Sequence, residues 1–110
     1  DVQQLENLTL YLNDHCIQDI PLEQIVRISC MSARKLQTAF KEYHGCTITE
    51  YIQQRRMSQA ETLLAKTDLS IGQVAQSVGY TSASRFAELF RKSTGLLPLE
   101  YRRMSKREKK

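Results

Sequence analysis

Four polar side chains have types and a spacing that suit hydrogen bonding to the bases of a nucleic acid. They recur at i, i+3, i+4 and i+7, which places them on one face of a helix: Arg34, Gln37, Thr38 and Lys41. Arg can pair with guanine O6 and N7, Gln with adenine N6 and N7, and the Thr methyl can contact a thymine methyl. We therefore predict base contacts by Arg34, Gln37 and Thr38, and a contact to the DNA backbone by Lys41.

A second polar face follows about fifty residues later, on a predicted helix over about 82–93. Its candidate base contacts are Ser84, Arg85 and Glu88. A carboxylate is less suited to the neighbourhood of phosphates, and two roles are open to Glu88. It accepts a hydrogen bond from cytosine N4, or it orients Arg85 and Lys92 from the i−3 and i+4 positions.

Further hydroxyl and basic side chains near these faces are candidates for contacts to the DNA backbone. They are Ser32, Arg55, Ser82, Arg91 and Lys92. For Arg55 on the connecting helix, a solvated face or an ion pair with Glu61 is an equally open interpretation. A single amphipathic helix exposes polar residues of this kind by default, so the argument depends on finding two matched helices.

Other chemistry has little support in the sequence. The three cysteines, Cys16, Cys30 and Cys46, are odd in number and form no CxxC pair, so neither a disulfide framework nor a zinc site is indicated. The two histidines are expected at the surface. We find no Ser/His/Asp or Cys/His set and no Gly-rich phosphate loop, and therefore predict no catalytic residue, no metal, no cofactor and no enzymatic activity.

The formal net charge of +4 is unevenly distributed along the 110 residues. The segment 102–110 alone carries +5, which leaves −1 for residues 1–101. A claim of DNA binding must therefore rest on where the charges lie. Between Arg27 and Arg56 the chain has six Lys or Arg and only two acidic residues, so the basic character lies close to the first polar face.

Targeting signals are also lacking. There is no apolar run of the roughly 20 residues that a membrane span requires, and no secretory leader. We expect a cytoplasmic protein without a membrane partner. The first residue is Asp1 and not Met, so we expect a piece of a longer protein or a trimmed chain.

The apolar spacing is helical almost throughout, and local signals set the predicted boundaries. Ser32, Ser70 and either Ser82 or Thr81 are expected N-caps, and Gly45 and Gly95 are expected to end helices. The predicted helices are about 2–16, a short one from residue 21, 33–44, 49–66, short ones from residues 71 and 98, and 82–93. The inward-facing set is expected to include Ile17, Leu22, Leu36, Phe40, Tyr43, Phe86 and Phe90, and the basic tail after Tyr101 is expected to fray.

The chain repeats itself. Ile25 matches Val74 at an offset of 49, and after the turn the offset becomes 50: Leu36 with Phe86, Phe40 with Phe90, Gly45 with Gly95, and Tyr51 with Tyr101. Each copy is a short helix, a tight turn and a longer helix, which is a helix-turn-helix. The predicted fold is all-α, with about seven helices forming two helix-turn-helix lobes joined by a long linker helix (homeodomain-like). The predicted divisions are 1–48, 49–66, 67–103 and a basic tail at 104–110.

The linker would set the spacing of the two lobes. A helix of about 18 residues spans roughly 27 Å at 1.5 Å per residue. With the width of the lobes added, the two recognition helices can reach successive major-groove segments about one DNA turn, roughly 34 Å, apart.

The second copy resembles the DNA-binding domain of the AraC/XylS family of bacterial transcription regulators. The stretch IGQVAQSVGYTSASRFAELFRKSTGLLPLEYR meets the family pattern at Ala75, Gly79, Tyr80, Ser84, Phe86, Phe90, Arg91, Gly95, Pro98, Tyr101 and Arg102. The resemblance extends from about Leu5 to Arg102 and includes a linker helix in YIQQRRMSQAETLL. It implies sequence-specific binding of double-stranded promoter DNA by two lobes and, usually, activation by contact with RNA polymerase. Effector sensing and dimerisation usually belong to a separate N-terminal domain, which this sequence does not include.

The first copy departs from this pattern at two positions. Val26 and Cys30 stand where the second copy has Ala75 and Gly79. Cys at a positive φ costs about 1 kcal/mol, so we expect a slightly opened or shifted turn in the first copy.

Two other classes of protein stay open on this sequence. The first is a helical protein-interaction domain that binds no DNA. The second is a DNA-binding module fused to an enzymatic half, as in the regulators of methyl-transfer DNA repair.

Overall fold

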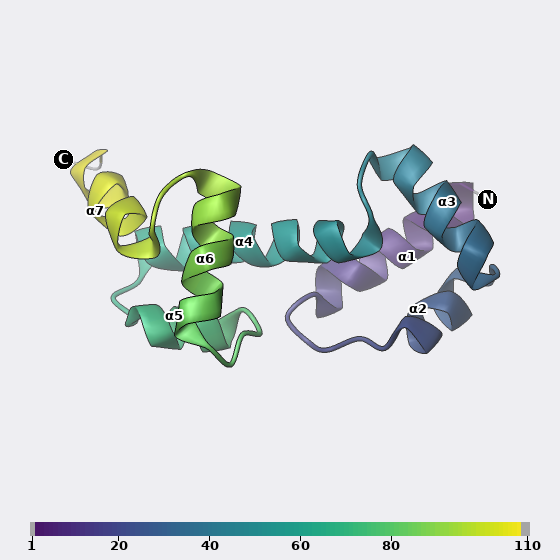
Figure 1. Ribbon diagram of the computed structural model, residues 1–110, viewed down its shortest axis with the longest axis horizontal. Coiled ribbons are helices and arrows are strands. Elements are labelled where there is room, and N and C mark those ends of the chain that lie inside the picture. Colours follow the sequence, from purple (N-terminus) through teal and green to yellow (C-terminus); the bar gives the residue numbers. More distant parts are fainter. Residues whose placement is uncertain (1, 109–110) are drawn as a thin grey trace. The chain divides into compact units, whose positions relative to one another are not determined.

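The computed structural model describes residues 2–108, and over that range it is all-α, which confirms the predicted fold class (Figure 1). The helices are α1 (Val2–His15), α2 (Leu22–Ser29), α3 (Ala33–His44), α4 (Ile48–Lys66), α5 (Ile71–Ser77), α6 (Ala83–Thr94) and α7 (Pro98–Glu108). None of the helices in this described part has the length and apolar character needed to cross a membrane.

The chain forms two compact units, residues 1–55 and 56–110, and each unit has its own hydrophobic core. The buried residues of the first core are Leu5, Leu8, Leu12, Ile25, Met31, Leu36, Phe40 and Ile48. Those of the second are Met57, Ala60, Leu64, Val74, Ala75, Val78, Phe86 and Phe90. The two ends of α4 therefore belong to different cores. Within each unit a short helix (α2 or α5) precedes a longer one (α3 or α6), as the sequence repeat predicts.

The helix boundaries follow from the local capping chemistry. The hydroxyls of Ser32 and Ser82 accept hydrogen bonds from the backbone N–H groups three residues on, each at 3.2 Å. Ser70 and Gln73 form a reciprocal capping box at the start of α5. At the other end, Gly45 (φ 76°) and Gly95 (φ 84°) terminate α3 and α6 in the left-handed region. The predicted caps and stops are confirmed.

The turn of the first unit differs from our expectation. Cys30 itself adopts the left-handed conformation (φ 59°, ψ 27°), as Gly79 does in the second unit (φ 94°), so the turn is not opened at this residue. The buried side chain of Ser29 helps to hold it. Its hydroxyl donates to the Val26 carbonyl at 2.7 Å and accepts from the Met31 N–H at 3.1 Å. These two hydrogen bonds fix the backbone on both sides of Cys30.

Replacing Cys30 by glycine is expected to stabilise the first unit. Relief of the strain of the left-handed conformation stabilises the folded state by about 1–2 kcal/mol. The greater conformational entropy of glycine in the unfolded chain offsets about 0.5–1 kcal/mol of this. The net increase in the free energy of unfolding should lie between about 0 and 1.5 kcal/mol, measured by urea denaturation. Gly79→Cys is the matched reverse change and should destabilise the protein. A lower urea midpoint for Cys30→Gly would show that Cys30 is not strained.

Three side chains predicted to face inward are exposed instead. The exposed fractions are 42% for Ile17, 49% for Leu22 and 46% for Tyr43. Ile17 lies beyond the end of α1, where the helical spacing no longer applies. On α3 the ring of His44 packs against Phe40 (centroids 4.4 Å apart), and the Tyr43 hydroxyl donates to the Glu6 carboxylate at the surface (3.4 Å).

The predicted fraying after Tyr101 was wrong for the residues that the structure describes. The helix α7 continues to Glu108. Arg102 Nε donates to the Leu64 carbonyl at 3.1 Å, and Lys106 Nζ lies 2.7 Å from Asp68 Oδ1. The Lys106 hydrogen bond and charge lower the pKa of the Asp68 carboxyl. Lys109 and Lys110 of the predicted tail lie outside the described residues.

His44 is half-buried, not a surface residue as expected. The Thr9 hydroxyl donates to the Leu5 carbonyl (2.8 Å), so its oxygen accepts from His44 Nε2 (2.8 Å), and that nitrogen carries the proton. Tyr51 packs on the same ring with centroids 4.9 Å apart. This enclosure removes the imidazole from water and lowers the pKa of His44.

Acid is therefore expected to destabilise the first unit. The His44 pKa is lower in the folded state than in the unfolded state, so the unfolded chain binds more protons once the pH falls below about 6.5. The free energy of unfolding should be level above that pH and should decrease below it, as measured by urea denaturation between pH 5 and pH 8. The decrease should be smaller in His44→Gln. An equal decrease in that variant would assign the effect to other groups.

Candidate nucleic-acid interface

The polar face of α3 lies opposite its buried face. Leu36 and Phe40 are fully buried, whereas Arg34, Gln37 and Lys41 are exposed. Thr38 is exposed too, and its hydroxyl donates to the Arg34 carbonyl at 3.3 Å. Because the hydroxyl is bonded to the helix backbone, the methyl group of Thr38 is the part available for an apolar contact. The four side chains singled out from the sequence thus share an exposed surface, and their contacts to DNA stay a prediction.

The matching face of α6 is also exposed. Ser84, Arg85 and Glu88 are accessible, while Phe86 and Phe90 are buried beneath them. Arg85 Nη1 lies 3.6 Å from Glu88 Oε2, which is the contact with Arg85 that the second of the two predicted roles of Glu88 requires, and the choice between the two roles stays a prediction. Both side chains are well exposed, and such pairs are worth little, so a binding partner can separate them at small cost.

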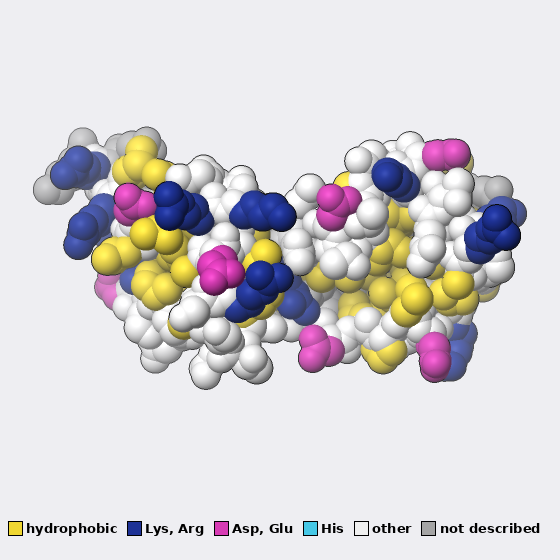
Figure 2. Space-filling view, viewed as in Figure 1, with side chains coloured by type: hydrophobic (Ala, Val, Ile, Leu, Met, Phe, Trp, Pro, Cys, Tyr) yellow, Lys and Arg dark blue, Asp and Glu magenta, His cyan; other side chains and the backbone are white. Residues whose placement is uncertain are grey.

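The candidates for backbone contacts differ in how accessible they are. Lys41 on α3 and Arg91 and Lys92 on α6 are exposed. The exposed Ser32 and Ser82 accept capping hydrogen bonds, which leaves each hydroxyl proton free to be donated. Around α6, Figure 2 shows Lys and Arg side chains with an acidic side chain between them.

Arg55 stands apart from that set. It is only partly exposed, and its Nε is buried without a hydrogen-bond partner. Its neighbour Arg56 lies over the ring of Tyr80 at 5.1 Å, and Glu61 accepts a hydrogen bond from the Tyr101 hydroxyl at 3.5 Å. We expect Arg55 to contribute less to phosphate binding than the exposed cations do.

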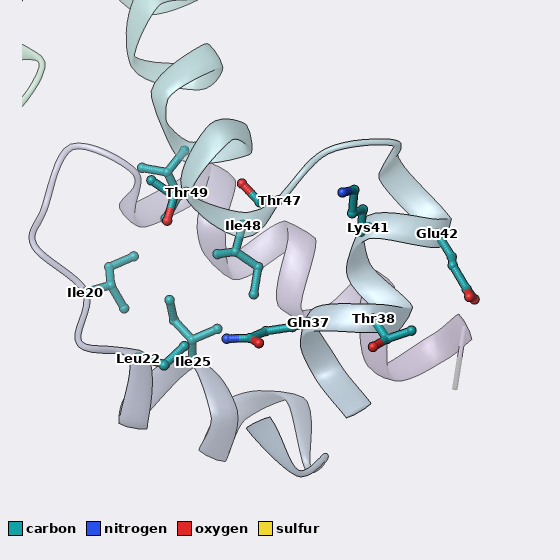
Figure 3. Close-up of a pocket in the computed structure, with 11 residues that line it drawn as sticks. Ile20, Leu22, Ile25, Gln37, Thr38, Lys41, Glu42, Thr47, Ile48 and Thr49 are labelled. Atoms are coloured by element: carbon teal, nitrogen blue, oxygen red, sulfur yellow. The ribbon is translucent and has the colours of Figure 1, made fainter. Parts of the chain in front are cut away.

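A pocket beside α3 was not found by reasoning from the sequence. It has a volume of about 820 Å³ and lies entirely within the first unit (Figure 3). Its lining residues are Ile20, Leu22, Ile25, Gln37, Thr38, Lys41, Glu42, Thr47, Ile48, Thr49 and Ile52. Three separate segments contribute to it, so no local pattern could have indicated it.

The cysteines and acidic residues build no metal centre within residues 2–108, since no group of three or more potential ligands comes together there. Cys16 is buried, Cys30 is exposed, Cys46 is intermediate, and all three are free thiols.

The geometry defines a class of protein: two helical units, each presenting an exposed polar helix behind a helix-turn-helix turn. Residues 25–104 match the family model described as a helix-turn-helix domain. The chain belongs to the AraC-type helix-turn-helix family, the DNA-binding domains of AraC/XylS transcription regulators.

Two curated relatives support this assignment. The chain is 35% identical over 108 residues to the bifunctional transcriptional activator/DNA repair enzyme AdaA of Bacillus subtilis, covering 98% of this chain and 51% of that protein. It is 34% identical over 92 residues to the xylose operon regulatory protein of Escherichia coli, covering 84% of this chain and 24% of that protein. The chain thus spans about half of the first relative and about a quarter of the second.

Solved structures have the same fold. The C-terminal domain of AraT, a response regulator from Geobacillus stearothermophilus, superposes with a TM-score of 0.85 at 29% identity, over 92% of this chain and 84% of that one. The DNA-binding domain of AdpA, solved in complex with a target DNA, gives a TM-score of 0.87 at 24% identity over 94% of each chain. At 24% identity, the similarity to AdpA supports the fold alone.

Proposed function

We propose that this chain binds double-stranded promoter DNA sequence-specifically, as the output domain of a bacterial transcription regulator. The observation that carries the proposal is the repeated arrangement of α3 and α6. Each has a buried aliphatic and aromatic face that fixes it to its unit, and an opposite exposed face of base-reading side chains. In this proposal the two helices enter successive major-groove segments.

On α3, three side chains divide the readout between them. Arg34 pairs with guanine, Gln37 with adenine, and the Thr38 methyl contacts a thymine methyl, because its hydroxyl is already bonded within the helix. Each bidentate pair is worth about 1–3 kcal/mol of discrimination against the wrong base.

On α6, Arg85 is the principal reader, and Ser84 adds a hydroxyl contact. Glu88 either keeps Arg85 oriented from its position at 3.6 Å or accepts from a cytosine N4 once the pair separates. Phosphate contacts by Ser32, Lys41, Ser82, Arg91 and Lys92 fix the position on the duplex without reading its sequence. Each cation that replaces a counterion contributes about −0.9 to the slope of log K against log salt.

Selection from a pool of random duplexes tests this proposal. Repeated binding and amplification should enrich a site with two short elements about 10–10.5 base pairs apart, one for each recognition helix. Enrichment of no common element would contradict sequence-specific binding and would favour a helical protein-interaction domain.

We further propose that binding activates transcription through contact with RNA polymerase, in the cytoplasm, with effector sensing and dimerisation supplied by an N-terminal domain. AdaA and other similar proteins are named as transcriptional activators, which supports this sign of regulation. Transcription in vitro from a promoter bearing the selected site should rise when the protein is added. A fall in transcript would indicate a repressor.

The likeness to AdaA also favours a second candidate, a DNA-binding module joined to an enzymatic half. AdaA is named as a bifunctional activator and DNA repair enzyme, and this chain matches it over 98% of its own length. A reading frame that encodes a repair domain next to this module would support that candidate. A sensor domain in that position would exclude it.

A further inference from the structure

The pocket in the first unit is an apolar cavity that opens beside the DNA-reading face of α3. Its apolar lining comes from Ile20, Leu22 and Ile25 on one side and from Ile48 and Ile52 of α4 on the other. Leu22 is 49% exposed, and Figure 2 shows hydrophobic side chains at the surface between α2 and α3. Burying such side chains against an apolar ligand would be favourable at about 25 cal/mol per Å².

The opposite edge of the pocket is polar and carries an unpaired cation. Gln37 and Lys41 line it from α3, and the side chain of neither forms a hydrogen bond or ion pair within residues 2–108. In Figure 3 the Gln37 amide points toward Ile25, while Glu42, the acidic lining residue, extends away from the other labelled side chains. The pocket therefore offers an anion the Lys41 cation, and the Gln37 amide at a separate point of its lining.

We propose that this pocket binds a small aliphatic carboxylate. Its volume of about 820 Å³ lies within the range of small-molecule sites, about 300–1,000 Å³. The apolar lining is made of branched aliphatic side chains and includes no aromatic ring, so it offers contact area to an aliphatic body and no stacking surface to a flat ring system. Lys41 supplies the positive charge that selects the carboxylate.

The ligand and DNA would then exclude one another at α3. This part of the inference rests on the proposed function, because Gln37 and Lys41 belong to both sites. Binding of the carboxylate would weaken DNA binding, and DNA would weaken binding of the carboxylate by the same factor. The second unit does not repeat the set, since Ala87 and Arg102 stand where the first has Gln37 and Ile52.

Methyl NMR of the full chain labelled at isoleucine tests the binding without DNA. The probe is 1-adamantanecarboxylate, and 1-adamantylammonium is the matched control with the same body and the opposite charge. The carboxylate should shift the methyl signals of Ile20, Ile25, Ile48 and Ile52, and should leave Ile71 of the second unit unchanged. No shift at millimolar probe, or equal shifts with both probes, would overturn the proposal.

Two variants define the site. Lys41→Gln should weaken binding of 1-adamantanecarboxylate roughly three- to tenfold, because it removes one exposed charge-assisted contact. Lys66→Gln, the same change at the end of α4, should have no effect. Leu22→Ser should weaken both probes, because the apolar contact does not depend on their charge. Unchanged affinity in Lys41→Gln would overturn the choice of a carboxylate.

Competition with the selected duplex separates the two claims. Added 1-adamantanecarboxylate should lower the affinity for DNA, and 1-adamantylammonium should not. If the methyl signals shift but DNA affinity is unaffected, the proposed exclusion at α3 is wrong. A protein that shows these shifts and binds no duplex at all would contradict the proposed function while leaving the ligand site in place.

Discussion

Arg34→Ala is expected to relax sequence preference at one or two base pairs of the selected site. The exposed guanidinium on α3 has no competing partner among residues 2–108, so its loss should remove the proposed base contact and leave the helix packing intact. Discrimination at those base pairs should fall by about 1–3 kcal/mol, measured by fluorescence anisotropy with duplexes substituted one position at a time.

Lys41→Ala is the matched control on the same helix. It should weaken binding to all duplexes alike and make the salt slope shallower by about 0.9. The Arg34 variant should retain most of the discrimination at base pairs read by α6. If the two variants behave identically, the assignment of Arg34 to bases and Lys41 to phosphate is wrong.

Phe86→Ala is expected to be the most destabilising of these substitutions. Its ring is fully buried under α6 and lies between Tyr80 (centroids 6.1 Å) and Phe90 (5.7 Å). Truncation of a buried Phe removes its burial and leaves a cavity, at a cost of about 3–5 kcal/mol. Urea denaturation followed by circular dichroism should show this decrease in the free energy of unfolding.

Ser84→Ala on the exposed face of α6 is the control for that experiment. It should change the free energy of unfolding by no more than about 0.5 kcal/mol, because it touches no buried contact. A small decrease in the free energy of unfolding of Phe86→Ala would mean that this aromatic cluster does not stabilise the second unit. A large decrease in the free energy of unfolding of Ser84→Ala would mean that the exposed face of α6 also contributes to stability.

Helix boundaries could be predicted well from the sequence because the signals that set them are local. Ser32 and Ser82 cap α3 and α6, and Gly45 and Gly95 end them, each through contacts within a few residues. The exposed polar faces of α3 and α6 follow from helical periodicity in the same way. Helical periodicity does not show where the neighbouring elements lie, and for this reason Tyr43 was expected to be buried.

Features that depend on distant residues were missed. The extension of α7 is accompanied by the contact of Lys106 with Asp68, 38 residues away in sequence. Ser29 holds the turn at Cys30 only because both of its hydrogen-bonding groups are used in the folded unit. The pocket beside α3 needs three segments at once, so its apolar residues looked like ordinary core positions.

The account depends most on sequence-specific recognition of a duplex, and one measurement tests it directly. Anisotropy titrations should compare the selected duplex with a scrambled duplex of the same composition at physiological salt. We predict a preference of about 10³-fold or more for the selected duplex. Equal affinity for the two duplexes at every salt concentration would contradict the account, because phosphate contacts alone would then explain all binding.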